Sequence, residues 1–244
     1  MSAKDQIFAK PLEDVSGFSF DAAVASVFPD MISRSVPGYA SVVAMSGFLA
    51  QRFAQPETRL YDLGCSLGAT SLSMAKALNE SQSSCEIIAI DNSADMLEQA
   101  KTILERERVQ QSVRLLHADI CDVEVSNASL IALNYTLQFV RPEKRSTLLA
   151  HLAGGMNSGG VLILSEKIAF DDNPVNELFS DLHHEFKRSK GYSDLEISQK
   201  RAAIENVLIP ETLEVHVARL RDAGFQRVEL WFQCLNFASL LAFK

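Results

Sequence analysis

The sequence has fewer basic than acidic residues, and it has no long apolar run near its start. Lysine and arginine number 23 against 31 aspartates and glutamates, which gives a formal net charge of -8. A broad basic surface for nucleic acid is therefore not expected, and small-molecule chemistry is the better expectation. Without an apolar run, we expect neither a signal peptide nor a membrane span.

Cysteine is scarce, and no arrangement of it suggests a metal site. The four cysteines are scattered along the chain: Cys65, Cys85, Cys121 and Cys234. They form no CxxC pair and no cluster with histidine at ligand spacing, so we interpret them as reduced thiols of a cytoplasmic protein. His183 and His184 are adjacent, and adjacent residues on a helix point to different faces. We expect no metal.

The length of 244 residues and the 47% hydrophobic content are enough for one sizeable core. We therefore expect a single domain over residues 1–244. Residues 1–16 are polar and are expected to pack loosely. From Phe18, apolar residues recur at helical spacing, which predicts an N-terminal helical segment over residues 18–55, interrupted at Pro37 and Gly38. This segment could be a lid over a ligand, but its periodicity favours a cover for the sheet.

A strand, a glycine turn and a helix follow one another over residues 60–78. The apolar strand ends in Asp62, and the chain turns through Gly64 and Gly68 into a helical pattern. Parallel sheets present nucleotide-type ligands to a helix N-terminus in this way. We expect Gly64 to permit the tight turn and Gly68 to let helix and strand approach closely. The alternative is an ordinary strand, turn and helix with a glycine-rich bend.

This motif differs from the dinucleotide fingerprint at two positions. Asp62 precedes the glycines, and Ser66 stands where a loop that cradles pyrophosphate would have a second glycine. A carboxylate here would repel phosphate, so the ligand is expected to be cationic or neutral at this point. That favours S-adenosylmethionine, which carries a positive amino group and a sulfonium, over a dinucleotide.

Three further strand ends carry polar residues that fit the same ligand. Asp91 ends the second strand 23 residues past Gly68, where an acid accepts hydrogen bonds from ribose hydroxyls. The alternative is a role at the start of the next helix, and both roles can hold together. Asp119 follows the third strand and is placed to meet the adenine amino group, unless it is a surface loop residue. Asn134 and Tyr135 end the fourth strand, where open α/β sheets place reacting groups.

The rest of the chain completes the fold. A fifth strand is expected over residues 160–166, and then a helical insertion over residues 168–210, where specificity would be built. Ser193 and Glu196 predict a capping box within it. A helix over residues 211–223 and two strands with a short link, which requires antiparallel pairing, close the chain. The expected fold is α/β: a Rossmann-like doubly wound seven-stranded sheet of the class I methyltransferase type, with the last strand antiparallel.

Several runs of this sequence, taken together, resemble the bacterial carboxy-S-adenosyl-L-methionine synthases. The similarity covers nearly the whole chain. It is carried by residues 27–39, 61–70, 91–93, 134–139, 196–201 and 230–234. The glycine loop alone would indicate only a methyltransferase fold.

The resemblance implies an unusual reaction. Such enzymes combine S-adenosylmethionine with prephenate and release carboxy-S-adenosylmethionine and phenylpyruvate. The expected course is decarboxylation of prephenate with loss of its hydroxyl, deprotonation of the sulfonium methyl to an ylide, and capture of carbon dioxide in a closed, dry pocket. The product feeds 5-oxyacetyl modification of the tRNA wobble uridine, which implies a functional link to a tRNA uridine carboxymethyltransferase.

The resemblance also implies the ligand contacts and a homodimer. Carried over position by position, the contacts are Tyr39, Gly64, Cys65, Ser66, Asp91, Asn92, Asp119, Ile120, Asn134 and Arg201. Arg201 is expected to reach the partner's site and to pair with the new carboxylate. No residue declares itself the base for the methyl proton, and we hypothesise that the hydroxide leaving prephenate serves. Two alternatives remain: a conventional methyltransferase acting on tRNA or a small molecule, and a non-catalytic carrier of the cofactor derivative.

Overall fold

The computed structural model describes residues 3–11, 17–81, 84–109 and 112–244. Its helices are α1 (Ala22–Ser35), α2 (Tyr39–Phe53), α3 (Ala69–Glu80), α4 (Ala94–Arg106), the 3-10 helix η1 (Leu137–Phe139), α5 (Pro142–Gly154), α6 (Asn173–Ser189), α7 (Asp194–Ile204) and α8 (Leu213–Asp222). Its strands are β1 (Arg59–Leu63), β2 (Glu86–Asp91), β3 (Val113–His117), β4 (Ala128–Asn134), β5 (Met156–Ala169), β6 (Glu211–Thr212), β7 (Arg227–Cys234) and β8 (Phe237–Phe243). None of the described helices is long and apolar enough to cross a membrane.

The strands form one mixed sheet in the order β3-β2-β1-β4-β5-β8-β7, with the two-residue β6 paired to β5. Strands β1 to β5 pair in parallel, whereas β8 pairs antiparallel with both β5 and β7. This confirms the expected seven-stranded doubly wound sheet with an antiparallel last strand. The order reverses beside β1, so β1 and β4 flank the switch point at which open α/β sheets bind ligands.

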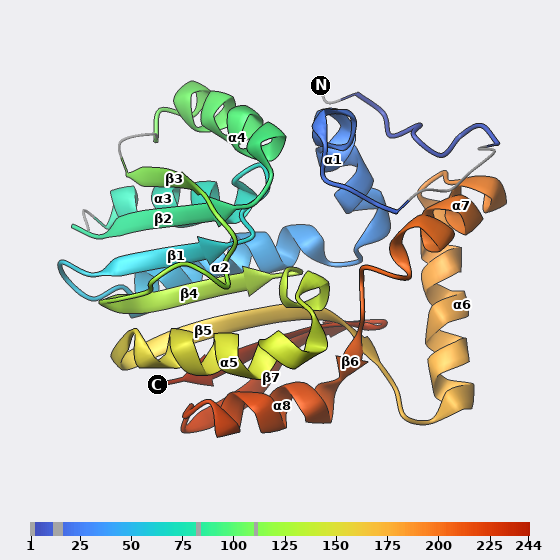
Figure 1. Cartoon of the computed structure of the whole chain (residues 1–244). Helices are drawn as coiled ribbons and strands as arrows, with labels where there is room; N and C mark the ends of the chain where they lie inside the picture. Colours follow the sequence, from blue (N-terminus) through green and yellow to red (C-terminus); the bar gives the residue numbers. More distant parts are fainter. Residues whose placement is uncertain (1–2, 12–16, 82–83, 110–111) are drawn as a thin grey trace.

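The central strands are apolar on both faces because helices cover both sides of the sheet (Figure 1). Alternate residues of one strand belong to different cores: Tyr61 of β1 packs with α5 and α8, and its neighbour Leu60 packs with α2, α3 and α4. Both side chains are 1% exposed or less. The period-two alternation thus fixes which helices lie on which face.

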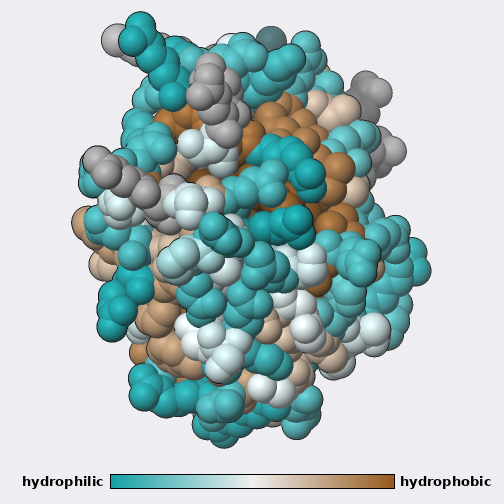
Figure 2. All heavy atoms as spheres, turned by 90° about the vertical axis from the view of Figure 1, so that its left-hand side faces the viewer, coloured by the Kyte–Doolittle hydropathy of each residue, from teal (hydrophilic) through white to brown (hydrophobic). Residues whose placement is uncertain are grey.

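The helical insertion lies at the carboxyl ends of the parallel strands. Figure 1 shows α6 and α7 apart from the layers that cover the sheet, at the end of the strands where α1 also lies. The expected capping box is present, since Ser193 accepts from the Glu196 amide and the Glu196 carboxylate accepts from the Ser193 amide. The opposite end of the sheet presents mostly hydrophilic residues around smaller apolar areas (Figure 2).

Two of the N-terminal residues 3–11 are fixed by tertiary contacts, although most of this segment is exposed and we expected the first sixteen residues to pack loosely. Asp5 and Phe8 are buried, and the Tyr192 hydroxyl donates to the Asp5 carboxylate. Gln199 of α7 donates to the Phe8 carbonyl. The expectation was wrong for Asp5 and Phe8, because these residues bond to partners 187 and 191 positions away in the chain. Residues 12–16 lie outside the described part.

Two expected boundaries also change. Strand β5 runs from Met156 to Ala169, well beyond the expected residues 160–166, because its first part pairs with β4 and its last part with β6. The last helix begins at Leu213 instead of residue 211, because Glu211 and Thr212 form β6 and the Thr212 side chain caps the helix.

Candidate functional site

A cavity of about 710 Å³ lies at the carboxyl ends of the strands that flank the switch point. Its volume falls in the range of small-molecule sites. Nine of the ten residues expected to contact the ligand line it: Tyr39, Gly64, Cys65, Ser66, Asp91, Asn92, Asp119, Ile120 and Asn134. Arg201 is the exception.

The glycine loop after β1 is held by the end of β2. The amides of Gly64 and Cys65 both donate to the Ile90 carbonyl, and the Ser66 amide donates to the Asp91 carboxylate at 2.8 Å. Gly64 has φ +75°, and a Cβ there would lie 2.3 Å from the Thr136 Oγ1. Glycine is therefore required at residue 64 by both conformation and space.

Gly68 plays a different part from the one expected. A Cβ at this position would meet its nearest neighbour, the Ala100 side chain, only at 3.7 Å, which is an ordinary contact. The residue has φ +77° and stands at the N-cap of α3 in the left-handed conformation. Glycine is therefore required at residue 68 by the backbone conformation of the turn. The close approach of helix and strand that we expected is not the reason.

Asp62 supplies a buried carboxylate at the end of β1. Its Oδ2 accepts from the amide and the hydroxyl of Ser71, at 2.9 and 2.6 Å. Burial raises the pKa of Asp62 to about 6, against the lowering effect of the Ser71 bonds. Burial and the charge of Asp62 together raise the pKa of the Tyr39 hydroxyl. The loop thus lies beside a buried acid, and a carboxylate at this point would repel a phosphate.

Asp91 and its neighbours form the second acidic wall. The Asp91 side chain is 9% exposed and accepts from the amides of Ser66 and Ser93. Burial raises its pKa, although these backbone bonds oppose the shift. The N-cap of α4 is Ser93, which accepts from the Met96 amide. Asp91 therefore faces the cavity and also orders the turn that begins the helix.

Asp119 and Ile120 continue this wall after β3. Asp119 is exposed and accepts from the Cys121 amide at 2.9 Å, whereas Ile120 is buried in the core beneath. Both line the cavity. An exposed acid beside a buried aliphatic side chain provides the polar edge and the apolar face that a purine needs.

Asn134 sits in a network of hydroxyl groups. Its Oδ1 accepts from Ser165 at 2.6 Å, and its Nδ2 donates to Thr70 and Ser46. The next residue, Tyr135, has φ +62°, an uncommon conformation for a large side chain. The network and the strained residue fix the floor of the cavity between β4 and β5.

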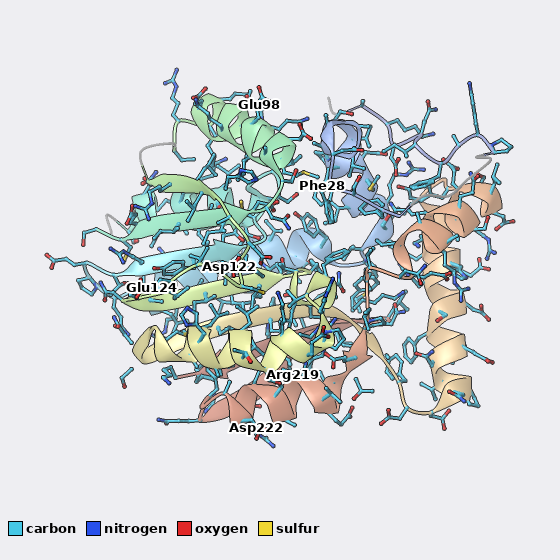
Figure 3. All side chains as sticks on the ribbon, viewed as in Figure 1. Phe28, Glu98, Asp122, Glu124, Arg219 and Asp222 are labelled. Atoms are coloured by element: carbon cyan, nitrogen blue, oxygen red, sulfur yellow. The ribbon has the colours of Figure 1, made fainter. Side chains whose placement is uncertain are left out.

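The two N-terminal helices differ in role: one lines the cavity, and the other covers the sheet. Phe28 of α1, labelled in Figure 3, lines the cavity together with Met31 of the same helix. Phe20 packs edge-on against Phe139 of η1, with ring centroids 5.3 Å apart. Helix α2 contacts α3, β4 and β5 and covers the sheet. The expectation of a cover holds for α2 apart from its first residue, Tyr39, which lines the cavity. It was wrong for α1, which forms a wall of the site.

Basic side chains on the far side of the cavity were missed in the sequence. Lys167 of β5, Lys187 of α6 and Lys200 of α7 all line it. Burial lowers the pKa of Lys187 to about 7, and the nearby Lys200, Lys167 and Arg201 add to this. Lys167 comes directly after the strand expected over residues 160–166, a position that could have indicated its role. Nothing in the sequence indicated Lys187 and Lys200, because their approach to the cavity depends on how the helices pack.

His183 also lines the cavity. Its ring Nε2 lies 2.7 Å from the Ser35 carbonyl, and burial lowers its pKa to about 3. The imidazole is therefore neutral and holds α6 against α1. Within the described part of the chain, no group of three or more histidines, cysteines or acids could hold a metal ion.

Arg201 is exposed on α7 and does not line the cavity of its own chain. It nevertheless lies near enough to Lys167 and Lys187 to lower the pKa of both. The arginine is thus beside the cationic end of the cavity but outside it. Its expected contact with the site of a partner stays a prediction.

Strand order, glycine loop and acidic walls together define a methyltransferase-type α/β protein. A family model described as a methyltransferase domain matches residues 60–160. The structure is similar to human N-acetylserotonin methyltransferase in complex with SAM, with a TM-score of 0.60 and 16% sequence identity. That similarity covers 91% of this chain and 55% of the human chain, so this chain spans little more than half of that protein. At this identity, the similarity establishes the fold.

Closer relatives identify the family. The chain is 54% identical to the carboxy-S-adenosyl-L-methionine synthase of Aeromonas hydrophila, over 100% of this chain and 97% of that protein. It is 50% identical to the enzyme of the same name from Aliivibrio fischeri, over the full length of both. The chain belongs to the carboxy-S-adenosyl-L-methionine synthase family, which confirms the resemblance found in the sequence.

Proposed function

We propose that this protein is an enzyme that makes carboxy-S-adenosylmethionine from S-adenosylmethionine and prephenate and releases phenylpyruvate and water. The observation that carries the proposal is a cavity lined by nine of the ten residues that the family resemblance implies. Family membership supports the reaction type, and the chemistry of the cavity walls supports the choice of substrates.

The acidic side of the cavity suits S-adenosylmethionine. Asp91 would accept hydrogen bonds from the ribose hydroxyls, and Asp119 and Ile120 would bind the adenine ring. Asp62, buried beside the glycine loop, would face the cationic methionine part of the substrate. A dinucleotide would instead bring phosphates to this loop, and the carboxylate would repel them.

The reaction needs a site that excludes water. Prephenate would lose carbon dioxide and hydroxide to become phenylpyruvate, the hydroxide would take a proton from the sulfonium methyl, and the resulting carbanion would form the new bond to carbon dioxide. An open site would let carbon dioxide escape and would protonate the carbanion. Phe20, Phe28 and Phe139 line the cavity and would provide this dry wall.

The cellular setting belongs to the same proposal. The protein would act as a cytoplasmic homodimer, in which Arg201 pairs with the new carboxylate in the partner's site. Its exposure on α7 leaves this arginine available for such a contact. The product would supply a tRNA uridine carboxymethyltransferase for 5-oxyacetyl modification of the wobble uridine.

One experiment tests the function against both alternatives. The full-length protein is incubated with methyl-labelled S-adenosylmethionine, with and without prephenate, and the products are resolved by mass. A cofactor heavier by one carboxyl group, formed repeatedly and only with prephenate, is the expected result. Methylated RNA formed without prephenate would show a conventional methyltransferase. Product limited to one equivalent per subunit would show a carrier.

A further inference from the structure

One end of the cavity is lined by two lysines for which the described part of the chain provides no acidic partner. Lys167 and Lys187 line the wall formed by β5 and α6. Across residues 3–11, 17–81, 84–109 and 112–244, neither ammonium group has a hydrogen-bond or ion-pair partner, and no acid contributes to the pKa of either. Lys200 differs, because it donates to the Ser35 hydroxyl and lies 3.7 Å from the Asp5 carboxylate.

Two unpaired ammonium groups in one wall of the cavity lower the stability of the folded protein. Both side chains are half-buried, and burial is the main cause that lowers the pKa of each. The neighbouring Arg201 carries the same charge and adds to the shift of both lysines. An anion between the two ammonium groups would remove this repulsion and replace the lost hydration.

Strand order places this cationic end away from the nucleoside end. Asp91 ends β2 and Lys167 lies on β5, and the order β2-β1-β4-β5 puts three strand spacings between them. At about 4.8 Å per spacing, the separation is about 14 Å. A nucleoside at β2 and β3 therefore leaves the β5 side of the cavity for a second molecule.

The surroundings of the cations suit an acid that also has a carbon ring. Ile204, Val207 and Leu208 follow Lys200 along the chain and line the same cavity. Phe237 of β8 lines it too and packs edge-on against His183. An apolar wall beside two ammonium groups fits a small molecule with a hydrophobic body and carboxylates at its ends.

We propose that Lys167 and Lys187 form the subsite that binds a carboxylate of the second substrate, a small carbocyclic dicarboxylic acid. The proposal rests on the proposed function, since it assumes that the cavity holds two substrates together. The paired lysines bind the acid that enters, whereas Arg201 is assigned to the carboxylate that the reaction creates. The carboxylate of the entering acid and the carboxylate of the product are thus bound by different cationic side chains.

The test separates binding of the acid from binding of S-adenosylmethionine. Lys167→Met and Lys187→Met are made singly and together in the full-length protein, with Lys190→Met as the matched control, because Lys190 is an exposed lysine at the end of the same helix α6 and does not line the cavity. Titration calorimetry measures S-adenosylmethionine alone, and then prephenate in the presence of S-adenosylhomocysteine. The KM for prephenate is measured in parallel.

Each single variant should weaken the binding of prephenate, raising both its Kd and its KM at least about tenfold. The double variant should raise both constants further. Affinity for S-adenosylmethionine should stay within about twofold, and Lys190→Met should match the wild type. Lys187→Arg should recover part of the loss, because charge alone is kept. Phenylpyruvate, with one carboxylate, should be less sensitive than prephenate to the double variant.

Two negative outcomes have different meanings. If the wild type binds prephenate and forms product while the variants bind prephenate unchanged, the lysine subsite is overturned and the proposed function stands. If the wild type binds no prephenate, both proposals fail. Thermal unfolding confirms that each variant is folded, and Lys187→Gln provides a second substitution should the methionine variant not fold.

Discussion

The carboxylate of Asp91 accepts a hydrogen bond from the backbone amide of Ser66 at 2.8 Å. This bond joins the end of β2 to the glycine loop that follows β1. The ends of these two neighbouring strands therefore form one continuous part of the cavity wall. Ser66 has φ +52°, which is uncommon for a side chain other than glycine, and the bond helps to hold it there.

Replacement of Asp91 should therefore affect both the ligand and the loop. We expect Asp91→Ala to weaken the binding of S-adenosylmethionine by about 2–3 kcal/mol, because two ribose hydroxyls lose a charged acceptor. The amides of Ser66 and Ser93 also lose their acceptor, so the variant should be less stable by about 1–2 kcal/mol. Asp91→Asn should be milder in both respects.

Calorimetry and urea denaturation measure these two effects. Glu98→Ala is the control, since Glu98 is an exposed acid on the adjacent α4 (Figure 3) and should change neither quantity. An unchanged affinity in Asp91→Ala would remove Asp91 from the site.

Gly64 is constrained by its neighbour Thr136 as well as by its own backbone. Gly64→Ala should destabilise the protein by about 1–2 kcal/mol from the positive φ alone, and by more because the new Cβ would lie 2.3 Å from the Thr136 Oγ1. Adding Thr136→Gly should recover the steric part and leave the backbone part. A double-mutant cycle followed by thermal or urea unfolding measures the coupling.

Gly154 provides a matched control for this cycle. It ends α5, and a Cβ at this position would meet nothing within 4 Å. Gly154→Ala should be neutral or slightly stabilising. Strict additivity of Gly64→Ala and Thr136→Gly would show that the side chain of Thr136 does not constrain the loop.

Arg201 should distinguish product from substrate. If it recognises only the added carboxyl group, Arg201→Ala should leave affinity for S-adenosylmethionine nearly intact and weaken carboxy-S-adenosylmethionine by about 2–4 kcal/mol. Arg201→Lys should restore part of that difference, because lysine keeps the charge but not the two-point contact. Equal affinities of wild type and Arg201→Ala for both ligands would mark a solvent-facing arginine.

The dimer offers a way to tell which site Arg201 serves. Mixing Arg201→Ala subunits with Asp91→Ala subunits should give heterodimers with one intact pocket if the arginine crosses the interface, as a two-fold symmetric dimer requires. Turnover of the mixture is then expected to exceed that of either parent. Heterodimers that are shown to have formed but that are no more active would place Arg201 beside its own pocket or outside the site.

Lys187 should make stability depend on pH. Its pKa is lowered to about 7 in the folded chain, against 10.5 for an unperturbed lysine. Between these values the unfolded chain binds the extra proton, so the free energy of unfolding should rise with pH from about 7 towards 10.5. The charged groups near it are Lys167 on β5 and Lys200 and Arg201 on α7, and the titratable groups on its own helix are His183 and His184.

Urea denaturation at pH 7 and pH 9 checks this in the absence of ligand. Lys187→Met should be more stable than wild type at pH 7 by about 1–2 kcal/mol after allowance for solvent screening, and the difference should shrink at pH 9. Lys190→Met should show no such change. A difference between Lys187→Met and wild type that is the same at both pH values would contradict the buried, unpaired state of this ammonium group.

Features that depend on neighbours in the chain could be predicted from the amino-acid sequence. Apolar runs ending in Asp62, Asp91 and Asn134 fixed the strands and the side chains at their carboxyl ends, because parallel strands deliver those ends to one edge of the sheet. The glycine loop and the capping box of α7 are local geometries that residue type specifies. Motifs spread over the whole chain were enough to identify the family.

Which distant elements close the site could not be predicted in this way, because it depends on contacts between segments far apart in the chain. The Tyr192 hydroxyl reaches Asp5, and the His183 ring reaches the Ser35 carbonyl, in both cases through contacts that no periodicity encodes. Those contacts hold α6 against α1 and Tyr192 against the N-terminal residues 3–11, and basic side chains of the insertion then line the cavity. The orientation of a helix that packs on several distant segments follows from the sum of their contacts, and a local pattern cannot specify it.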